Sequence, residues 1–380
     1  MTIEICHQLS DVPADQWNAL GDGDNPFIRH EFLGALEQYH CLGEEHGWLP
    51  HHLLYRDETG RLLGAVPLYL KDNSYGEFVF DWGWADAYHR NGLNYYPKLV
   101  SSIPYTPAQG PRLLLHPEAE QEAVAGALID ASLNLAKELD LSSLHYLFTL
   151  ADDTRRLREK GLILRMGVQY HWHNHGYRDF DHYLERFASK KRKNVRQERR
   201  KVHDAGVEIE VFHGDEIDAA LWETIHHYYR ITFDKKSGYA TLSKGFFQSV
   251  AQTMPRSLVV FMAKHEGRYV AASICFRGET TLYGRHWGCD EHFNSLHFEL
   301  CYYQGLEYAI REGLLHFEPG AQGEHKVSRG FEPTRTWSAH WIAHPQFRQA
   351  ITDHVERERR AMEDFINTLN EHLPFKQEAP

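Results

Sequence analysis

The chain contains two copies of one hairpin pattern, and this internal repeat constrains its fold more than any other feature. The stretch DETGRLLGAVPLYL (57–70) aligns without a gap with KHEGRYVAASICFR (264–277). In this alignment Gly60-Arg61 meets Gly267-Arg268, and both pairs sit between two apolar runs. In both halves an aromatic strand, a long helix and further strands are expected after the hairpin. A repeat of this length indicates duplicated domains and not a short-period solenoid.

The length of the chain agrees with two domains, because 380 residues exceed what one hydrophobic core ordinarily holds. We place the boundary near residues 176–180, which predicts a first domain over 1–178 and a second over 179–380. The second domain includes a C-terminal amphipathic helix. Strands alternate with helices in both halves, so the predicted fold class is α/β, with two tandem domains built on mixed central sheets.

The composition excludes several classes of protein. A hydrophobic content of 42% and an aromatic content of 13% fit a folded chain and not a disordered one. No apolar run approaches the roughly 20 residues that a membrane-spanning helix needs, so we expect no transmembrane segment. The N-terminus has no signal-peptide pattern and the five cysteines are scattered, which predicts reduced thiols in the cytoplasm. A net charge of −12 argues against DNA as a partner.

One segment opposes this acidic balance. The run SKKRKNVRQERRKV (189–202) holds eight basic residues and one acid. It falls within a predicted helix over 181–205, on which Lys193, Arg196 and Arg200 share one face. One interpretation is a solvated helix paired with the acidic remainder of the chain. The other is an electrostatic site for a phosphate-bearing ligand, because Lys and Arg bind phosphate through charge and hydrogen bonds.

The richest candidate site is the loop EPGAQGEHKVSRGFEPT (318–334). Acyl transfer to an amine needs a base near the incoming nitrogen and positive charge near the developing oxyanion. Glu318 or His325 can supply the base, and Lys326 or Arg329 the positive charge. Gln322 lies in the same loop and is a candidate for substrate binding. The alternative interpretation is a solvated polar turn.

A second group of candidates lies in RHWGCDEHFNSLHFE (285–299). On a strand, Arg285 and Trp287 share a face. His297 and Glu299 then begin the next helix. Charged and aromatic side chains at such a junction suit a substrate pocket, with Glu299 as a further catalytic candidate. A structural contact between the histidine and the glutamate is the alternative.

The first half contributes the loop PYTPAQGPRL (104–113). Because proline and glycine restrict this loop, we expect it to have a function and not to be a solvent-exposed spacer. Tyr105, Gln109 and Arg112 are predicted to form one wall of a cleft between the domains. The alternating histidines in QYHWHNHGY (169–177) can bind zinc in principle, but no carboxylate matches them, so we expect packing or cleft lining and no metal.

The order of elements, present twice, resembles the GNAT acyltransferase fold, and the duplication resembles the FemAB-like branch of that superfamily. Two motifs carry the resemblance: the pattern SKxRxNxR at 189–196, and the lysine-containing turn before Gly-Phe in EHKVSRGFEP (324–333). The chain is most similar to an uncharacterised bacterial subgroup of N-acyltransferases, through PYTPAQGPRLL (104–114) and the 318–334 loop.

The resemblance implies N-acyl or aminoacyl transfer to an amine on a small-molecule, peptide-like or cell-envelope precursor. It implies an acyl-CoA or an aminoacyl-tRNA as donor, and it favours Lys326 as a phosphate or oxyanion partner. The chain departs from the family in two respects. It lacks the coiled-coil arm of some Fem transferases, and apart from Gly288 it shows no glycine-rich pyrophosphate turn before the 296–313 helix.

Two other functions stay open at the level of sequence. The first is a non-catalytic binder of a phosphorylated or peptidoglycan-type ligand, with a degenerate transferase site. The second is a metal-dependent enzyme. The oligomeric state is not addressed by any pattern in the chain.

Overall fold

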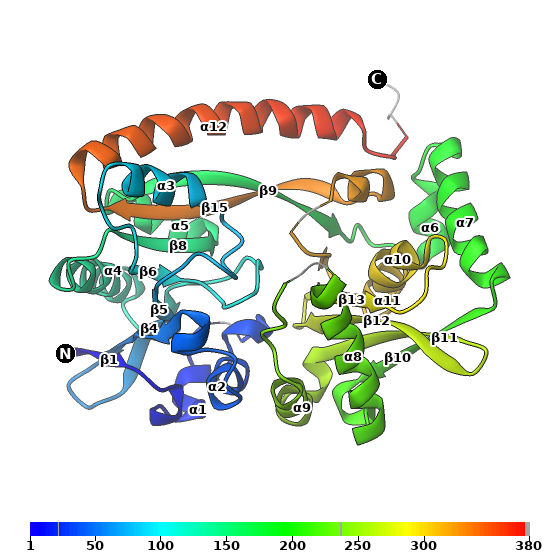
Figure 1. The fold of residues 1–380 in the computed structure, drawn as a ribbon, viewed down its shortest axis with the longest axis horizontal. Helices are drawn as coiled ribbons and strands as arrows, with labels where there is room; N and C mark the ends of the chain where they lie inside the picture. The colour runs from blue at the N-terminus through cyan, green and yellow to red at the C-terminus, as the bar shows by residue number, and fades with distance from the viewer. Residues whose placement is uncertain (22, 236–237, 322, 377–380) are drawn as a thin grey trace. The chain divides into compact units, whose positions relative to one another are not determined.

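The computed structural model describes residues 1–21, 23–235, 238–321 and 323–376 (Figure 1). The chain forms two compact units. The first unit comprises Met1–Val168 and Arg335–Phe365, and the second comprises Gln169–Thr334 and Ile366–Pro380.

The first unit contains a four-stranded sheet and one part of a larger mixed sheet (Figure 1). The four-stranded sheet has the order β1-β3-β4-β7, formed by Thr2–Cys6, His52–Arg56, Leu62–Val66 and Leu114–Leu115. The larger sheet contributes β15-β8-β6-β5-β2, formed by Glu332–Ile342, Ser143–Thr149, Lys98–Ser101, Leu68–Lys71 and Trp48–Pro50. Strands β6 and β8 are parallel, whereas β5 pairs antiparallel with β6 and β15 pairs antiparallel with β8.

The helices of the first unit cover a core of leucine, isoleucine and valine. They are α1 to α5, with bounds Ala14–Asn18, His30–Gln38, Trp82–Arg90, Gln121–Glu138 and Ala151–Glu159, followed by part of α12 (Pro345–Glu371). Helix α4 is rich in alanine and leucine, which are strong helix formers. Its Leu128 and Ile129 are buried in one cluster with Leu99 and Leu144 of the parallel strands.

The second unit contains the other part of the mixed sheet, in the order β10-β11-β12-β13-β14-β9. The strands are Val207–His213, Leu258–His265, Arg268–Arg277, Thr281–Cys289, His316–Glu318 and the end of Ile163–His173. Among the described residues of these strands, β13 and β14 pair in parallel and the other pairs are antiparallel. The helices are α6 (Phe180–Glu185), α7 (Ser189–Asp204), α8 (Ala219–Lys235), α9 (Lys244–Thr253), α10 (Leu296–Phe298), a π-helical turn Glu299–Tyr303, α11 (Gln304–Arg311) and a 3-10 helix Glu324–Arg329.

The predicted repeat is present in the structure. The first copy forms the hairpin β3-β4 and the second forms β11-β12. Gly60 and Gly267 both have positive φ, 86° and 76°, which the tight turns require and which glycine adopts without strain. In each unit a later parallel strand pair is joined through a helical crossover, α4 in the first unit and α10 to α11 in the second. The mixed α/β organisation therefore follows the predicted order.

The units differ in extent from the predicted domains 1–178 and 179–380. The C-terminal segment 335–365 belongs to the first unit, because Trp337–Ile342 pairs with β8 and completes its sheet. Ile351 and Val355 of α12 then pack against Trp84 and Tyr88. Such pairing between strands far apart in the chain leaves no local signal.

The predicted helix over 181–205 is wrong in one respect, because it is two helices separated at Ala188. Phe187 forms a bridge with Phe375, and the amide of Ala188 donates to the carbonyl of Pro374 at 2.8 Å. These hydrogen bonds to the C-terminal segment replace helical ones. The predicted end is confirmed, since Gly206 has φ of 71° directly after the last turn.

Candidate functional site

The candidate site lies at the carboxyl end of the parallel pair β13 and β14 in the second unit. Residues 281–283 pair with 316–318, so Glu318 is the last residue of its strand. In α/β sheets ligands bind beyond the carboxyl ends of parallel strands. The register of β13 against β12 shifts between Ile274 and Cys275, which leaves Arg285 as an extra residue. Such bulges redirect side chains and occur next to active sites.

Lys326 reaches this site from the 3-10 helix Glu324–Arg329. Its side chain is buried, with 2% of the residue exposed, and its Nζ donates a hydrogen bond to the carbonyl oxygen of Gly320 at 2.7 Å. Burial lowers the pKa of Lys326 from 10.5 to about 7. Near neutral pH both the charged and the neutral form of this amine are therefore populated, so it can act as a cation or as a base.

Glu318 faces a neutral imidazole. Its Oε1 lies 3.9 Å from Nδ1 of His171, whose Nε2 is 3.0 Å from the side-chain oxygen of Gln169. Burial, followed by the nearby His173 and Lys326, lowers the pKa of His171 to about 3. The imidazole therefore carries no charge at neutral pH, and it does not hold the Glu318 carboxylate in a salt bridge.

Arg285 adds a positive charge to the same region. Burial lowers the pKa of its guanidinium to about 10, while Tyr229 and the carboxylate of Glu318 act in the opposite direction. Arg285 therefore stays protonated at neutral pH. Glu318 at the carboxyl end of β14 therefore interacts with the charge of Arg285, and Lys326 is bound to Gly320 in the loop that follows the strand.

The predicted aromatic residues meet in one cluster next to this site. Nε2 of His325 is 2.8 Å from the hydroxyl of Tyr302. The ring of His297 lies between those of Trp287 and Tyr302, at centroid distances of 5.3 and 5.4 Å, and 6.2 Å from that of His325. Burial, followed by the charges of Arg329 and Lys326, lowers the pKa of His325. The cluster therefore joins the 285–299 segment to the 318–334 loop, two segments that the sequence offers only as separate candidate sites.

The side chain of Arg329 is held in place by contacts with other residues of the second unit. Its Nη2 donates to both carboxylate oxygens of Glu198 at 2.8 and 2.9 Å, its Nε donates to the hydroxyl of Tyr303 at 3.0 Å, and its Nη1 donates to the carbonyl of His325 at 2.7 Å. The guanidinium also lies 3.5 Å from the centroid of the Phe298 ring. These contacts make Arg329 a residue that positions the 3-10 helix carrying Lys326.

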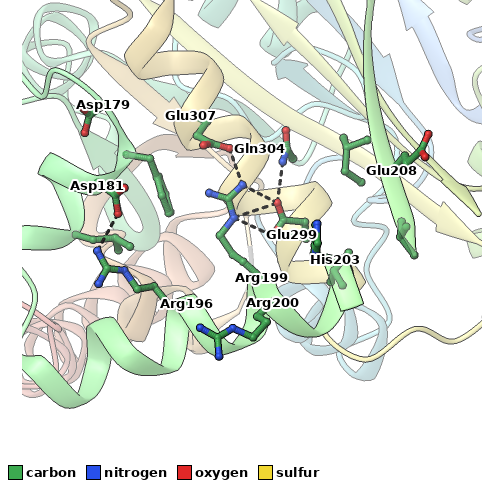
Figure 2. A pocket seen from close by; sticks show the side chains of 15 residues that line it. Asp179, Asp181, Arg196, Arg199, Arg200, His203, Glu208, Glu299, Gln304 and Glu307 are labelled. Atoms are coloured by element: carbon green, nitrogen blue, oxygen red, sulfur yellow. Dashed lines mark hydrogen bonds and ion pairs between the residues drawn. The ribbon is translucent and has the colours of Figure 1, made fainter. Parts of the chain in front are cut away.

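A second feature of this unit is an open cleft of about 720 Å³ beside the basic helix α7 (Figure 2). Arg199 lies at its centre, with its Nη2 at 2.9 Å from Oε1 of Glu299 and 2.6 Å from Oε2 of Glu307. Gln304 donates to the same Glu299 carboxylate at 2.7 Å. Figure 2 shows these side chains converging from α7 and from the π-helical turn and α11. Glu299, a predicted catalytic residue, is therefore buried and bound in an ion pair with the partly exposed Arg199.

Arg199 was missed by the sequence interpretation. Its position on α7 contains a usable signal, because Arg199 is four residues after Val195 and three before Val202. Residues with this spacing share one helix face, and both valines are buried. A cation on the buried face of a helix needs a carboxylate partner, which Glu299 provides.

The three predicted phosphate-binding residues lie on the exposed face of α7. Arg196 pairs with Asp181 at 2.9 Å. Arg200 lines the cleft of Figure 2, and Lys193 lies outside it. Neither Arg200 nor Lys193 forms an ion pair within the part of the chain that the structure describes.

The three predicted residues of the first unit divide into two groups. Tyr105 and Arg112 are buried, with the Tyr105 hydroxyl donating to the carbonyl of Cys41 at 2.8 Å and Nε of Arg112 donating to the carbonyl of Leu147 at 2.7 Å. Gln109 instead lines a cleft of the first unit. A role for these residues in a cleft between domains stays a prediction. Gln322 lies outside the described residues.

Gly288 serves packing in this structure. A Cβ placed on it would lie 1.8 Å from the carbonyl oxygen of Tyr228 in α8. The space that a glycine offers to a pyrophosphate is therefore filled by a helix. Within residues 1–21, 23–235, 238–321 and 323–376, the alternating histidines of β9 and all other His, Cys, Asp and Glu side chains form no group of three suited to a metal ion.

The family model described as peptidoglycan biosynthesis/recognition, FemAB-like, matches residues 8–377. The chain belongs to the FemAB-like family. No curated protein matches it closely enough to count as a relative. None of the helices in the described part of this FemAB-like chain is long and apolar enough to cross a bilayer.

Solved structures with low identity share the fold. The C-terminal domain of a protein described as a lysylphosphatidylglycerol synthetase from Agrobacterium fabrum matches with a TM-score of 0.54 at 10% identity, over 90% of this chain and 95% of its own. L-PGS from Bacillus licheniformis matches with 0.53 at 11%, over 88% and 93%. FemX matches with 0.52 at 11%, over 93% and 100%. The predicted fold class, two tandem GNAT-like domains, is confirmed.

Proposed function

We propose that this FemAB-like chain transfers an acyl or aminoacyl group to an amine of a peptide-like or cell-envelope precursor, and that its second unit performs the chemistry. One observation carries the proposal: the buried amine of Lys326 is held on the carbonyl of Gly320, two residues after Glu318 at the end of β14. Membership of a family described by peptidoglycan biosynthesis supports a cell-envelope acceptor. The similar fold of a lysylphosphatidylglycerol synthetase supports aminoacyl transfer.

In the proposed step, the neutral amine nitrogen attacks the carbonyl carbon of the activated donor, and Glu318 accepts the proton that the nitrogen loses as the C–N bond forms. The tetrahedral intermediate then collapses, and the C–O bond of an ester or the C–S bond of a thioester breaks. The ammonium form of Lys326 stabilises the negative oxygen of the tetrahedral intermediate. The proton on Glu318 passes to the leaving group. Because the donor is already activated, no covalent intermediate with the protein is needed.

An aminoacyl-tRNA is the favoured donor over an acyl-CoA. The turn after β13 has its one glycine, Gly288, filled by α8, so its backbone is not open to a pyrophosphate. Arg200 and Lys193 on α7 are exposed and unpaired among the described residues, which suits contacts to a phosphate backbone.

The test is a transfer assay on the full chain, with mass spectrometry of the amide product. Donors are mixed aminoacyl-tRNA, acetyl-CoA and a longer acyl-CoA, and the acceptor is a nucleotide-linked muropeptide. We expect Glu318→Gln and Lys326→Met each to lower the rate by roughly 10² or more. Glu324→Gln, an exposed carboxylate of the same loop, is the matched control and should keep full activity.

Full activity in both site variants would contradict the assignment of the site. A melting-temperature increase with the muropeptide, without product from any donor, would support the non-catalytic binder instead.

A further inference from the structure

The first unit contains a second cleft, of about 390 Å³, at the carboxyl end of β8. Strand β8 is parallel to β6, with residues 99–101 opposite 144–146, and it ends at Thr149, which lines the cleft. This is the place in the first unit that corresponds to Glu318 in the second, since both follow the helical crossover and end a strand of the parallel pair. The duplicated fold therefore places a second polar cleft at the position where ligands bind in α/β sheets.

Three arginines make the lining of this cleft positively charged. On α5, Ala151, Arg155 and Arg158 have i, i+4 and i+7 spacing and share one face. On β15, Arg335 and Trp337 alternate, so they point to one side of the sheet. None of the described residues that line the cleft is acidic, although the whole chain carries a net charge of −12.

Two of the three guanidiniums are available to a ligand. Arg158 and Arg335 are exposed and form no ion pair or side-chain hydrogen bond within the described residues. Arg155 is held by Glu122 at 2.7 Å and by Glu159 at 3.1 Å, so it contributes charge from a fixed position. The side-chain amide of Gln109, also in the lining, forms no hydrogen bond among the described groups.

The start of α5 adds backbone donors to these side chains. The helix begins at Ala151, and Leu150, which precedes it, has no side chain that can cap the first amides. Of the two acids in this turn, Asp152 does not line the cleft, and the carboxylate of Asp153 accepts from the amides of Arg112 and Leu113 at 2.7 and 3.2 Å. A helix start open to a cleft favours an anion.

We propose that this cleft binds the phosphate group of a small phosphorylated ligand, with Arg158 and Arg335 as its clamp and Gln109 as a neutral hydrogen-bonding partner. Paired guanidiniums match phosphate because each presents two parallel N–H donors. The volume of about 390 Å³ exceeds that of a phosphate ion, given that one water occupies about 30 Å³ of liquid. The remaining space lies beside Trp337, which can pack against a ring in the ligand. This site is separate from the proposed transfer site and does not depend on it.

The experiment is calorimetric titration of the full chain with inorganic phosphate, pyrophosphate and phenyl phosphate, with benzoate as the carboxylate counterpart. We expect phenyl phosphate to bind more tightly than inorganic phosphate, and benzoate to bind weakly. The double variant Arg158→Gln/Arg335→Gln should weaken phenyl phosphate binding by about tenfold or more. Arg90→Gln, an exposed arginine paired with Asp86 in the same unit, is the matched control.

Three results would overturn the proposal. The first is no binding of any phosphate probe to the unmodified chain. The second is unchanged affinity in the double variant, whose folding is checked by its melting temperature. The third is loss of binding in Lys193→Gln/Arg200→Gln with retention in the double variant, which would assign the phosphate to α7 instead.

Discussion

Glu198 of α7 and Arg329 of the Glu324–Arg329 helix form a two-oxygen ion pair across 131 positions of sequence, at 2.8 and 2.9 Å. Glu198 is the one acid in the basic run 189–202. Arg329 is three residues after Lys326 and lies almost fully buried. The helix that stands out in sequence for its cations is therefore joined to the candidate catalytic loop through the one carboxylate of its basic run.

This ion pair should be measurable as a coupling free energy. In a double-mutant cycle of Glu198→Gln and Arg329→Gln, we expect about 1–3 kcal/mol in the free energy of unfolding, because the arginine is buried and the loss of its partner leaves a charge uncompensated. Urea unfolding provides the measurement. The control cycle is Arg196→Gln with Asp181→Asn, an exposed pair on the same helix, for which we expect less than about 1 kcal/mol. Equal coupling in the two cycles would contradict a structural role for Arg329.

Replacing Lys326 with methionine should stabilise the protein while it lowers the transfer rate. The pKa of Lys326 is about 7 in the folded chain and 10.5 as the ordinary value, so below pH 7 both states are protonated and the folded state bears the full cost of a buried cation. Between pH 7 and 10.5 the unfolded state binds more protons, and stability rises with pH. We expect Lys326→Met to raise the unfolding free energy at pH 6 by on the order of a few kcal/mol, and this gain to shrink toward pH 10. A variant that is less stable than the unmodified chain at pH 6 would be inconsistent with this cost.

The same pKa predicts the pH dependence of transfer. If the ammonium form of Lys326 stabilises the oxyanion, the rate should fall as pH rises through about 7. Lys326→Arg keeps its charge in this range, so its residual rate should not show that decline. Rates measured from pH 5.5 to 9 with one donor decide the point. A rate that instead rises through pH 7 would mean that neutral Lys326 acts as a base.

The two arginines beside the cleft of Figure 2 should behave differently. Arg199→Gln leaves Glu299 buried without its cation, and we expect a loss of about 1–3 kcal/mol in unfolding free energy. Arg200 is the next residue and its side chain is exposed, so we expect Arg200→Gln to change the unfolding free energy by no more than about 0.5 kcal/mol. Urea unfolding of both variants under one set of conditions makes the comparison. A large loss for Arg200→Gln would indicate a structural role for the exposed face.

Gly288 should be intolerant of any side chain. The Cβ of Gly288→Ala would meet the carbonyl oxygen of Tyr228 at 1.8 Å, so β13 and α8 must move apart and the melting temperature should drop by several degrees. Gly83→Ala is the control, because that helical glycine has no atom within 4 Å of a Cβ, and it should raise stability by about 0.5–1 kcal/mol. An unchanged melting temperature in Gly288→Ala would show that the turn has room for a ligand after all.

Much of the fold could be predicted because local patterns encode it. The turn glycines Gly60 and Gly267 mark both hairpins, and His297 and Glu299 begin the helix after β13 as expected. The C-terminal path of the chain could not be predicted in this way. Trp337–Ile342 completes a sheet whose partner strand β8 lies far earlier in sequence, and hydrogen bonds to residues 374–376 divide the predicted helix at Ala188.

The sequence by itself determined the duplicated α/β fold, the amphipathic face of α7 and the residue types available at the carboxyl end of β14. Periodicity, turn glycines and the alternation of strands and helices are properties of neighbouring residues, so they survive without the tertiary structure. Only the tertiary structure decided which charges are free. Arg329 and Glu299 are bound by residues 131 and 100 positions away, whereas Lys326 has a backbone carbonyl as its hydrogen-bond acceptor. The identity of a buried partner depends on packing between distant segments, and no local pattern specifies that packing.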